Sequence, residues 1–576
     1  MLSRILQRQL RQAVAAVLPD ADTTAVLVRP TVDARFGDYQ ANALMALAKA
    51  RKINPRQLAT DVAARMDVAQ WCEPVEIAGA GFLNFRLKPG AIATALGEAL
   101  RGGNLFFERA ATQRTVVIDF SSPNVAKPMH VGHIRSTVLG DSLARTLRLL
   151  GHRVVTDNHI GDWGTQFGKL IVGWNTILNR ESLEADPIGE MERLYKQINS
   201  ACETDPSVLE SARQELVKLQ AGDPENLDIW RTMIALSENQ FERVYRRLNV
   251  KFDVTLGESF YNARLKSVVE ELKRRDIARL SDGAMVAFFE GIPALKDHPA
   301  MVQKSDGGFN YATTDLATLQ YRWEGGSWGG HPNEIIYVTG APQQLHFQQV
   351  FEIFRRWHPE ATVRLSHVWF GSVLGEDGRP FKTRAGDTVR LEELLDEAEE
   401  RALNVVSEKS PELPAEQRKE IARVVGLGSI KYADLSQNRQ SDYVFSWDKM
   451  LSLQGNTAPY LLYAYTRVKS IFRKGGESAA AGSDELTLSA PEEIALARHI
   501  LNFGLVLEAV AEEHRPNYLC AYLYELSAHF ARFYEACPVL KAEGASRQTR
   551  LALCDLTARV LKQGLDALGI ETTEQM

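Results

Sequence analysis

Residues 130–133 read His-Val-Gly-His and follow a loop that contains Pro123 and Pro128. Apolar side chains recur at helical spacing after this segment, so both histidines are predicted to share one face at a helix N-terminus. Free backbone N–H groups and the positive end of the helix dipole favour a phosphate there. Because Gly132 has no side chain, a planar base or a phosphate can reach the backbone, and His130 and His133 can donate to phosphoryl oxygens. The segment predicts a nucleotide site.

The same two histidines have two other interpretations: a surface pair without function, or two metal ligands that await a third. The surroundings favour the phosphate. Residues 115–120 form a short β-branched run typical of a buried strand, the helical spacing over 134–150 stops at Gly151, and a second strand is expected at 153–156. A strand, a helix and a strand in this order imply a parallel sheet with a ligand crevice at the carboxyl ends of its strands.

The composition sets the broad class of the chain. Its 576 residues exceed what one hydrophobic core holds, so roughly three or four domains are expected. A net charge of −6 creates no global positive field, so composition alone disfavours a nucleic-acid partner. Five cysteines without a Cys-x-x-Cys pair argue against a disulfide framework or a structural zinc site and favour a reducing cytoplasm. No apolar run approaches the roughly 20 residues of a transmembrane helix, so no membrane is expected.

Patterning divides the chain into three expected domains. Residues 1–110 read as an α+β domain that opens with an amphipathic helix. Residues 111–386 alternate strands and helices, as in an α/β domain, with a helical insertion at about 174–250. Residues 387–576 are expected to be helical throughout. Further strands of the central sheet are predicted at 334–339 and 367–370.

The segment 130–133 resembles the HIGH signature of class I aminoacyl-tRNA synthetases, and residues 121–133 are similar to the corresponding block of the arginyl-tRNA synthetase family. Further blocks of that family are matched in the same order, and the likeness covers essentially the whole chain: residues 158–168, 340–346, 431–435 and 455–460. The resemblance implies a class I Rossmann-like parallel-sheet catalytic domain with a helical insertion, an N-terminal α+β domain that recognises the tRNA D-loop, and a C-terminal all-helical anticodon-binding domain.

The activity implied by the resemblance is ATP-dependent activation of L-arginine to arginyl-adenylate, followed by transfer of arginine to the 2′-hydroxyl of the terminal adenosine of tRNA(Arg). Activation is expected to require bound tRNA. Two other classes remain open at this point: a different HIGH-bearing nucleotidyltransferase or synthetase, and a non-catalytic RNA-binding relative. A pair of carboxylates at Asp119 and Asp315 would not suit an apolar amino acid, which argues against the first.

Class I enzymes carry a second, lysine-rich signature of the KMSKS type, from which this chain departs. Residues 378–386 retain Lys382 and Arg384 but lack the usual second lysine. In similar members of the family a lysine just before the HIGH segment is thought to compensate, and Lys127 occupies that place. Positioned cations and Mg²⁺ are what a transfer from ATP chiefly requires. The cluster could also be a solvated turn, but its flanking glycines favour a hinged loop over ATP.

The resemblance therefore assigns ATP binding to His130, Gly132, His133 and Lys382, and catalysis to His130, His133, Lys127, Lys382 and Arg384. Mg²⁺ is expected to accompany ATP, with no structural metal in the protein.

A substrate guanidinium favours planar carboxylate acceptors. Asp119 ends the first strand at the crevice, and Tyr311 and Asp315 match the family block that holds the guanidinium. Ser122, Asn124 and Gln343 match positions that hold the α-amino and carboxylate groups or line the pocket. Asp119 and Asn124 could instead be capping or turn residues, and Tyr311 a core residue. A site built for arginine can reject lysine without an editing domain.

The helix expected at 459–474 carries Tyr460, Tyr463 and Arg467. Aromatic side chains between cations can stack on unpaired bases and neutralise phosphates, although each tyrosine could equally belong to a helix-bundle core. Phe82 and Asn84 match positions where related enzymes contact the D-loop. The implied partners are tRNA(Arg), L-arginine and ATP, and the implied state is a cytoplasmic monomer. Local basic patches on an acidic body would then reconcile the net charge with RNA binding.

Overall fold

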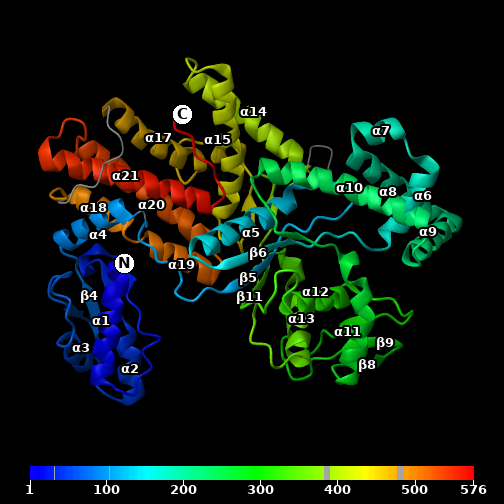
Figure 1. Ribbon diagram of the computed structural model, residues 1–576, viewed down its shortest axis with the longest axis horizontal. Helices are drawn as coiled ribbons and strands as arrows, with labels where there is room; N and C mark the ends of the chain where they lie inside the picture. The colour runs from blue at the N-terminus through cyan, green and yellow to red at the C-terminus, as the bar shows by residue number, and fades with distance from the viewer. Residues whose placement is uncertain (32, 103, 382–388, 476–485) are drawn as a thin grey trace.

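The computed structural model describes residues 1–31, 33–102, 104–381, 389–475 and 486–576. Lys382 and Arg384 therefore lie outside the described residues. A central parallel sheet separates two groups of elements (Figure 1): the N-terminal domain and the C-terminal helices lie together at one end, and helices α6 to α10 form an arm at the other. The chain thus places its first and last domains against each other.

The N-terminal domain is an α+β unit, as predicted. Its amphipathic helix α1 buries Leu6, Leu10 and Val14 completely. The four strands form one antiparallel sheet in the order β1-β2-β4-β3. The elements are α1 (Leu2–Val17), β1 (Arg29–Pro30), β2 (Tyr39–Ala41), α2 (Ala43–Arg51), α3 (Pro55–Ala63), β3 (Glu76–Ala78), β4 (Phe82–Phe85) and α4 (Pro89–Gly102).

The central sheet has five parallel strands in the order β12-β11-β5-β6-β7. Helix α5 (Val131–Leu149) connects β5 to β6, which confirms the predicted βαβ unit. Val116 and Val117 are neighbours on β5, so their side chains point to opposite faces of the sheet. Both are fully buried, which shows that both faces are covered. The strands are β5 (Thr115–Asp119), β6 (Arg153–Asn158), β7 (Val254–Thr255), β11 (Glu334–Tyr337) and β12 (Arg364–His367).

The strand predicted at 367–370 is wrong in its position, because β12 ends where that prediction begins. β12 is an edge strand with polar side chains, and Arg364 and Ser366 bond to the buried carboxylate of Glu334 at 3.3 and 2.8 Å. Because these side chains are polar, β12 has no apolar run that would predict a strand. The apolar residues after it continue beside β11, where Phe370 forms an isolated bridge with Gly340.

The helical arm is formed by α6 (Gln166–Ile177), α7 (Arg180–Ala185), α8 (Pro187–Thr204), α9 (Pro206–Gln220) and α10 (Pro224–Arg247). Three of these helices begin with proline, and the aspartate before each proline accepts a backbone N–H bond: Asp186, Asp205 and Asp223. Proline suits the first helical position and aspartate the N-cap, so the sequence sets these helix starts locally.

A second, antiparallel sheet in the order β10-β9-β8 follows the arm in the sequence and was not predicted. It consists of β8 (Ala278–Ser281), β9 (Ala284–Ala287) and β10 (Ala300–Gln303). Three helices accompany it: α11 (Asn262–Arg274), α12 (Tyr311–Trp323) and α13 (Gln344–Trp357). Helix α12 contacts both β10 and α13, and Arg322 in its last turn contacts the central sheet.

The C-terminal region is a helical bundle with one exception. The two-residue strand β14 (Tyr443–Val444) pairs in parallel with β13 (Val373–Leu374), so the prediction of helix throughout is wrong there. Gly569 follows the last helix with φ +70°, a left-handed conformation that commonly ends helices. The helices are α14 (Leu391–Lys409), α15 (Ala415–Leu435), α16 (Trp447–Met450), α17 (Ala458–Gly475), α18 (Pro491–Ile500), α19 (Phe503–Glu513), α20 (Asn517–Ala536) and α21 (Gly544–Ala567).

By length and composition alone, Pro491–Glu513 is apolar enough to cross a membrane, which the search for apolar runs did not find. In the structure this stretch forms two helices, α18 and α19, and half of its most apolar window is buried among other residues. Core helices of globular proteins show the same composition, so this is weak evidence for a membrane span.

Candidate active site

The loop between β5 and α5 is held in a conformation that few residue types adopt freely. Ser121, Ser122 and Ala126 have φ values of 72°, 49° and 60°. Each such residue costs on the order of 1–3 kcal/mol and persists only where the surroundings fix it. The backbone N–H of Ser122 donates to Asn158 Oδ1 at 3.1 Å, and that of Ala126 donates to Ser237 Oγ at 3.0 Å. Bonds to β6 and α10 therefore fix the approach to the histidine pair.

The two histidines form a pre-arranged pair at the start of α5. The N-cap residue is His130, whose Nδ1 accepts from Gly132 N at 3.1 Å. The Nδ1 atom of His133 accepts from His130 N at 3.0 Å, and the two ring centroids lie 4.0 Å apart. Since both Nδ1 atoms accept, each neutral ring carries its proton on Nε2 and can donate it to an anion.

Burial lowers the pKa values of both imidazoles. The pKa of His133 falls to about 3, chiefly by burial and then by the charge of His130. Burial also lowers the pKa of His130, and the positive charge of Lys127 lowers it further. The pair is consequently neutral at pH 7 and acts as two hydrogen-bond donors at a helix N-terminus, without the charge of an imidazolium.

Lys127 is exposed, and its Nζ lies 5.3 Å from the ring centroid of Tyr195 on α8. The chain that returns after residues 382–388 pairs with the beginning of α5. Val131 N donates to Val389 O at 3.0 Å, and Leu391 N donates to Met129 O at 2.9 Å. The described chain from Val389 to Leu391 is therefore anchored directly beside the start of α5 and its histidine pair.

Tyr311 and Asp315 lie together on the first turns of α12. Tyr311 is 63% exposed, so the interpretation of this residue as core is wrong. Asp315 Oδ2 lies 2.5 Å from His346 Nε2, and the His346 ring centroid lies 4.9 Å from that of Tyr311. His346, at the start of α13, thus contacts both residues that were predicted to recognise a guanidinium.

Asp119 ends β5 as predicted, but both of its carboxylate oxygens have partners within the protein. Oδ2 lies 2.8 Å from Nη1 of Arg322, and Oδ1 accepts from Ser122 Oγ at 2.9 Å. The Arg322 guanidinium also pairs with Asp157 at the end of β6, at 2.8 Å. These three charged side chains are buried, so Asp119 does not stand in the crevice as an unpaired carboxylate.

Glu258, which the sequence analysis missed, joins Asp315 in this region. It begins the 3₁₀ turn Glu258–Tyr261, directly after β7. Burial, and after it the nearby carboxylates of Asp315 and Asp162, raise the pKa of Glu258 to about 7. A carboxyl group that follows a parallel strand can be recognised from the sequence as a candidate site residue. Here β7 has only two residues, so no strand pattern before Glu258 marks its place at the sheet edge.

Asn124 and Gln343 are exposed at the carboxyl edge of the sheet. Asn124 forms an isolated parallel bridge with Gly161, after β6, and Gln343 ends the 3₁₀ turn Ala341–Gln343 that follows β11. Loops after β5, β7 and β11 thus supply Asn124, Glu258 and Gln343 to one edge. The arrangement matches the ligand crevice of open α/β sheets.

The residues predicted to contact tRNA differ in exposure. Phe82 is partly buried, whereas Asn84 is only 3% exposed and its Oδ1 accepts from Gln40 Nε2 at 2.8 Å. Tyr463 is 44% exposed on α17, so it is not a bundle core residue.

Arg467 on α17 connects two aromatic rings. Its guanidinium carbon lies 5.8 Å from the ring centroid of Tyr463 and 4.7 Å from that of Tyr534. Tyr460 is partly buried and packs against Tyr524 at 5.5 Å. An exposed tyrosine beside an arginine is therefore present on this helix, as stacking on a base requires.

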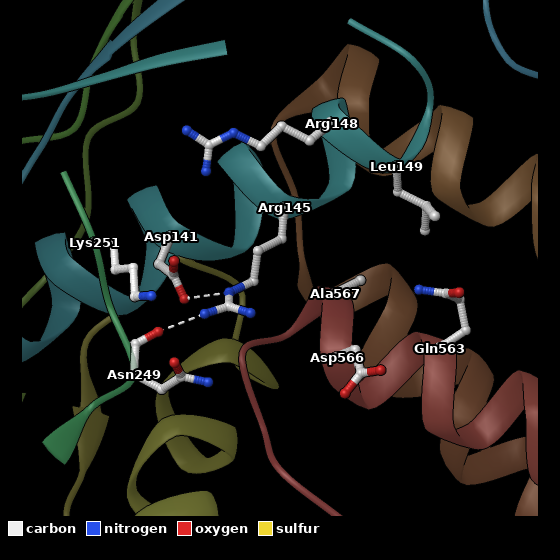
Figure 2. Close-up of a pocket in the computed structure, with 9 residues that line it drawn as sticks. All are labelled: Asp141, Arg145, Arg148, Leu149, Asn249, Lys251, Gln563, Asp566 and Ala567. Carbon is white, nitrogen blue, oxygen red and sulfur yellow. Dashed lines mark hydrogen bonds and ion pairs between the residues drawn. The ribbon is translucent and has the colours of Figure 1, made fainter. Parts of the chain in front are cut away.

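A separate pocket of about 530 Å³ lies further along α5, between that helix, residues 249–251 and α21 (Figure 2). Arg145 Nε lies 2.7 Å from Asp141 Oδ2, and a further nitrogen of the same guanidinium bonds to the carbonyl oxygen of Asn249. Arg148 pairs with Asp253 at 2.7 Å. None of the described residues predicted to bind the nucleotide lines this pocket, so it is not the predicted nucleotide site.

Comparison with known families agrees with this geometry. The family model "tRNA synthetases class I (R), catalytic domain" matches residues 95–447. "Arginyl tRNA synthetase N terminal domain" matches residues 4–87, and "DALR anticodon binding domain" matches residues 461–576. The fold is that of a class I aminoacyl-tRNA synthetase. Within that class, the chain belongs to the arginyl-tRNA synthetase family.

Individual relatives cover the full length. "Arginine--tRNA ligase" of Hahella chejuensis is 47% identical over 99% of this chain and 100% of its own, and the protein of the same name from Synechococcus elongatus is 45% identical over 99% of each. The arginyl-tRNA synthetase structures of Plasmodium falciparum and Thermus thermophilus both superpose with a TM-score of 0.84. They are 29% and 27% identical and cover all of this chain, with 99% and 100% of their own chains covered.

Proposed function

We propose that the chain is an arginine–tRNA ligase that joins L-arginine to ATP and then to tRNA(Arg). The observation that carries this proposal is that one crevice contains both neutral hydrogen-bond donors and carboxyl groups. The neutral donors of His130 and His133 lie at a helix N-terminus on its edge, and Asp315 and Glu258 supply carboxyl groups after other strands. Phosphates suit the first group and a guanidinium suits the second.

In the first step, a carboxylate oxygen of arginine attacks the α-phosphorus of ATP, and pyrophosphate leaves. Negative charge grows on the phosphoryl oxygens, so His130 and His133 donate from Nε2 to the transferring group. Lys127 adds positive charge beside them, and we assign the same role to Lys382 and Arg384, which lie outside the described residues. Gly132 allows close approach of ATP to the backbone.

Mg²⁺ enters with ATP and screens its phosphate charges. The described ranges contain no cluster of three or more His, Cys, Asp or Glu side chains that could hold a metal ion. The groups that we assign to the phosphates are the histidine pair and the cations.

For the amino acid, Asp315 and Glu258 face the guanidinium, and the exposed ring of Tyr311 packs along it. Ser122, Asn124 and Gln343 hold the α-amino and carboxylate groups. Asp119 acts through the groups it bonds, Ser122 and Arg322, because its oxygens are already occupied. Lysine lacks the planar donors that these carboxylates pair with, which gives selectivity.

In the second step, the 2′-hydroxyl of the terminal adenosine attacks the arginyl carbonyl, and AMP leaves. Residues 1–110 recognise the D-loop through Phe82 and Asn84, with Phe82 the more accessible of the two. Residues 387–576 read the anticodon through Tyr460, Tyr463 and Arg467, and residues 111–386 hold the reaction. We infer a cytoplasmic monomer, and the five free cysteines suit a reducing compartment.

Exchange of pyrophosphate into ATP tests the proposal. Arginine, lysine and cysteine are each supplied with and without tRNA(Arg), and exchange is expected with arginine plus tRNA. Absence of exchange with arginine and tRNA overturns the ligase assignment. Equal exchange with lysine overturns only the assignment of Tyr311, Asp315 and Glu258 to arginine selection.

A further inference from the structure

Helix α12 carries Tyr311, Asp315 and Arg322 along one face, and only the first two were assigned to the substrate. Asp315 follows Tyr311 by four residues, and Arg322 follows Asp315 by seven. Residues at these spacings lie along one stripe of a helix. The stripe therefore begins with the groups proposed to bind the guanidinium and ends, about 10 Å further on, with a buried arginine.

Arg322 ties this helix to the central sheet. Its guanidinium lies 2.8 Å from Asp119 at the end of β5 and 2.8 Å from Asp157 at the end of β6. It also lies over the ring of Tyr337 at the end of β11, with the guanidinium carbon 5.1 Å from the ring centroid. One side chain thus contacts the carboxyl ends of three adjacent strands.

The same ion pair extends to the loop that leads to the histidines. Asp119 accepts from Ser122 Oγ at 2.9 Å, and Ser122 has the strained φ of 49°. Arg322 consequently stands between two parts of the site: the first turns of α12, and the loop between β5 and α5. Their separation must match the length of an arginine joined to the α-phosphate of ATP.

We propose that Arg322 is a positioning residue for arginine activation, which sets the distance between the guanidinium-binding turns of α12 and the nucleotide-binding loop after β5. The inference rests on the proposed function. A lysine keeps the positive charge but cannot reach both carboxylates with a planar fork, so the two roles of charge and geometry are separable by substitution.

The test measures arginine-dependent pyrophosphate exchange at saturating tRNA, with KM determined separately for arginine and for ATP. Arg322→Lys is expected to raise the KM for arginine, or lower kcat, roughly ten- to a hundredfold, because small displacements of reacting groups cost that much. The KM for ATP is expected to stay within about twofold, since the contacts of His130 and His133 are unchanged. Wild-type arginine kinetics in this variant overturn the inference.

A double variant separates geometry from simple neutralisation. Arg322→Met alone leaves Asp119 and Asp157 buried without a counter-ion and is expected to lower the melting temperature strongly. Arg322→Met with Asp157→Asn restores the net charge of the cluster, so it is expected to regain thermal stability while its arginine KM stays high. Recovery of wild-type arginine kinetics in the double variant would show that Arg322 only neutralises charge, and overturns the inference.

Arg550→Lys is the matched control. Arg550 pairs with the buried carboxylate of Glu493 at 2.8 Å in the C-terminal bundle, away from the crevice. The Arg550→Lys variant is expected to change thermal stability without changing the KM for arginine or the KM for ATP. A wild-type chain that shows no arginine-dependent exchange overturns the proposed function and this inference together, whereas an active wild type with unaffected Arg322 variants overturns this inference alone.

Discussion

His346 Nε2 lies 2.5 Å from Asp315 Oδ2, across the interface between α13 and α12. The same imidazole packs against Tyr311, with the ring centroids 4.9 Å apart. One histidine therefore orients both the carboxylate and the aromatic ring that are proposed to receive the substrate guanidinium. Neither Asp315 nor the exposed Tyr311 is enclosed by α12 alone, so their geometry depends on α13.

Substitution His346→Ala removes this support. Asp315 and Tyr311 then gain rotamer freedom, and the KM for arginine is expected to rise roughly tenfold, the scale of one lost charge-assisted hydrogen bond. The KM for ATP is expected to stay unchanged in pyrophosphate exchange. His346→Gln, which keeps a hydrogen-bond donor, is expected to lose less. Equal KM values for arginine in His346→Ala and wild type would contradict the orienting role.

Glu258 gives arginine binding a defined pH dependence. Its pKa is raised to about 7 by burial and by Asp315 and Asp162, so the free protein holds this carboxyl partly protonated at neutral pH. A bound guanidinium favours the carboxylate and lowers its pKa, so binding releases a proton, about half a proton at pH 7. Affinity for arginine is accordingly expected to rise from pH 6 to pH 8.

Calorimetric titration in two buffers of different ionisation enthalpy measures this proton release. Glu258→Gln cannot ionise, so it is expected to bind arginine more weakly and without the release. If the variant releases as many protons as the wild type, another group is responsible and Glu258 does not face the substrate.

A side chain at position 132 is expected to impair catalysis. A Cβ at this position would lie 2.9 Å from Cε1 and 3.0 Å from Nδ1 of His130, closer than van der Waals contact allows. Gly132→Ala is therefore expected to displace the His130 ring and lower kcat for exchange tenfold or more, on the order of one lost transition-state donor. Alanine has the better helix propensity, so thermal stability is expected to be unchanged or higher. Wild-type kcat would show that the ring accommodates the methyl group.

Local patterns predicted the βαβ unit, the start of α5 and the helical arm, because caps, prolines and apolar spacing act within a few residues. The position of β12 and the existence of β8–β10 were not predictable in this way. These strands have at most four residues, and pairing with distant segments decides where they begin.

The site was predictable to the extent that family motifs mark it. Arg322 and Glu258 carry no local signal, since each matters through burial beside residues distant in sequence. The partners of Asp119 could not be predicted either. The local sequence of an aspartate at the end of a strand does not differ between one that faces a substrate and one that pairs with an internal arginine. Long-range packing, rather than residue type, decides between these roles.

His133 makes the stability of the catalytic domain depend on acid pH. Its folded pKa is about 3, below the usual value near 6.5, chiefly because it is buried. Between these values the unfolded chain takes up a proton that the folded chain does not, so this contribution is complete above pH 6.5 and is lost as the pH falls toward 3. At pH 5 the loss amounts to about 2 kcal/mol.

Urea unfolding at pH 7.5 and pH 5.0 measures this effect, with His133→Gln as the comparison. The variant lacks the titrating ring, so its stability is expected to fall less between the two pH values. Identical pH dependence in both proteins would place the proton uptake elsewhere.

Tyr463 and Arg467 are expected to contribute to tRNA binding by different forces. Tyr463→Ala removes an exposed ring that can stack on a base, so the KM for tRNA is expected to rise roughly tenfold. Arg467→Gln is expected to raise the same KM at low salt and to matter less as salt increases, because phosphate contacts are screened. Aminoacylation at two salt concentrations separates the two effects, while the KM for arginine stays constant. Tyr465→Phe is the control, since Tyr465 is buried on the same helix and its hydroxyl bonds to Glu574 at 3.1 Å. A similar rise in that control would mean that α17 acts through bundle stability and not through contact with RNA.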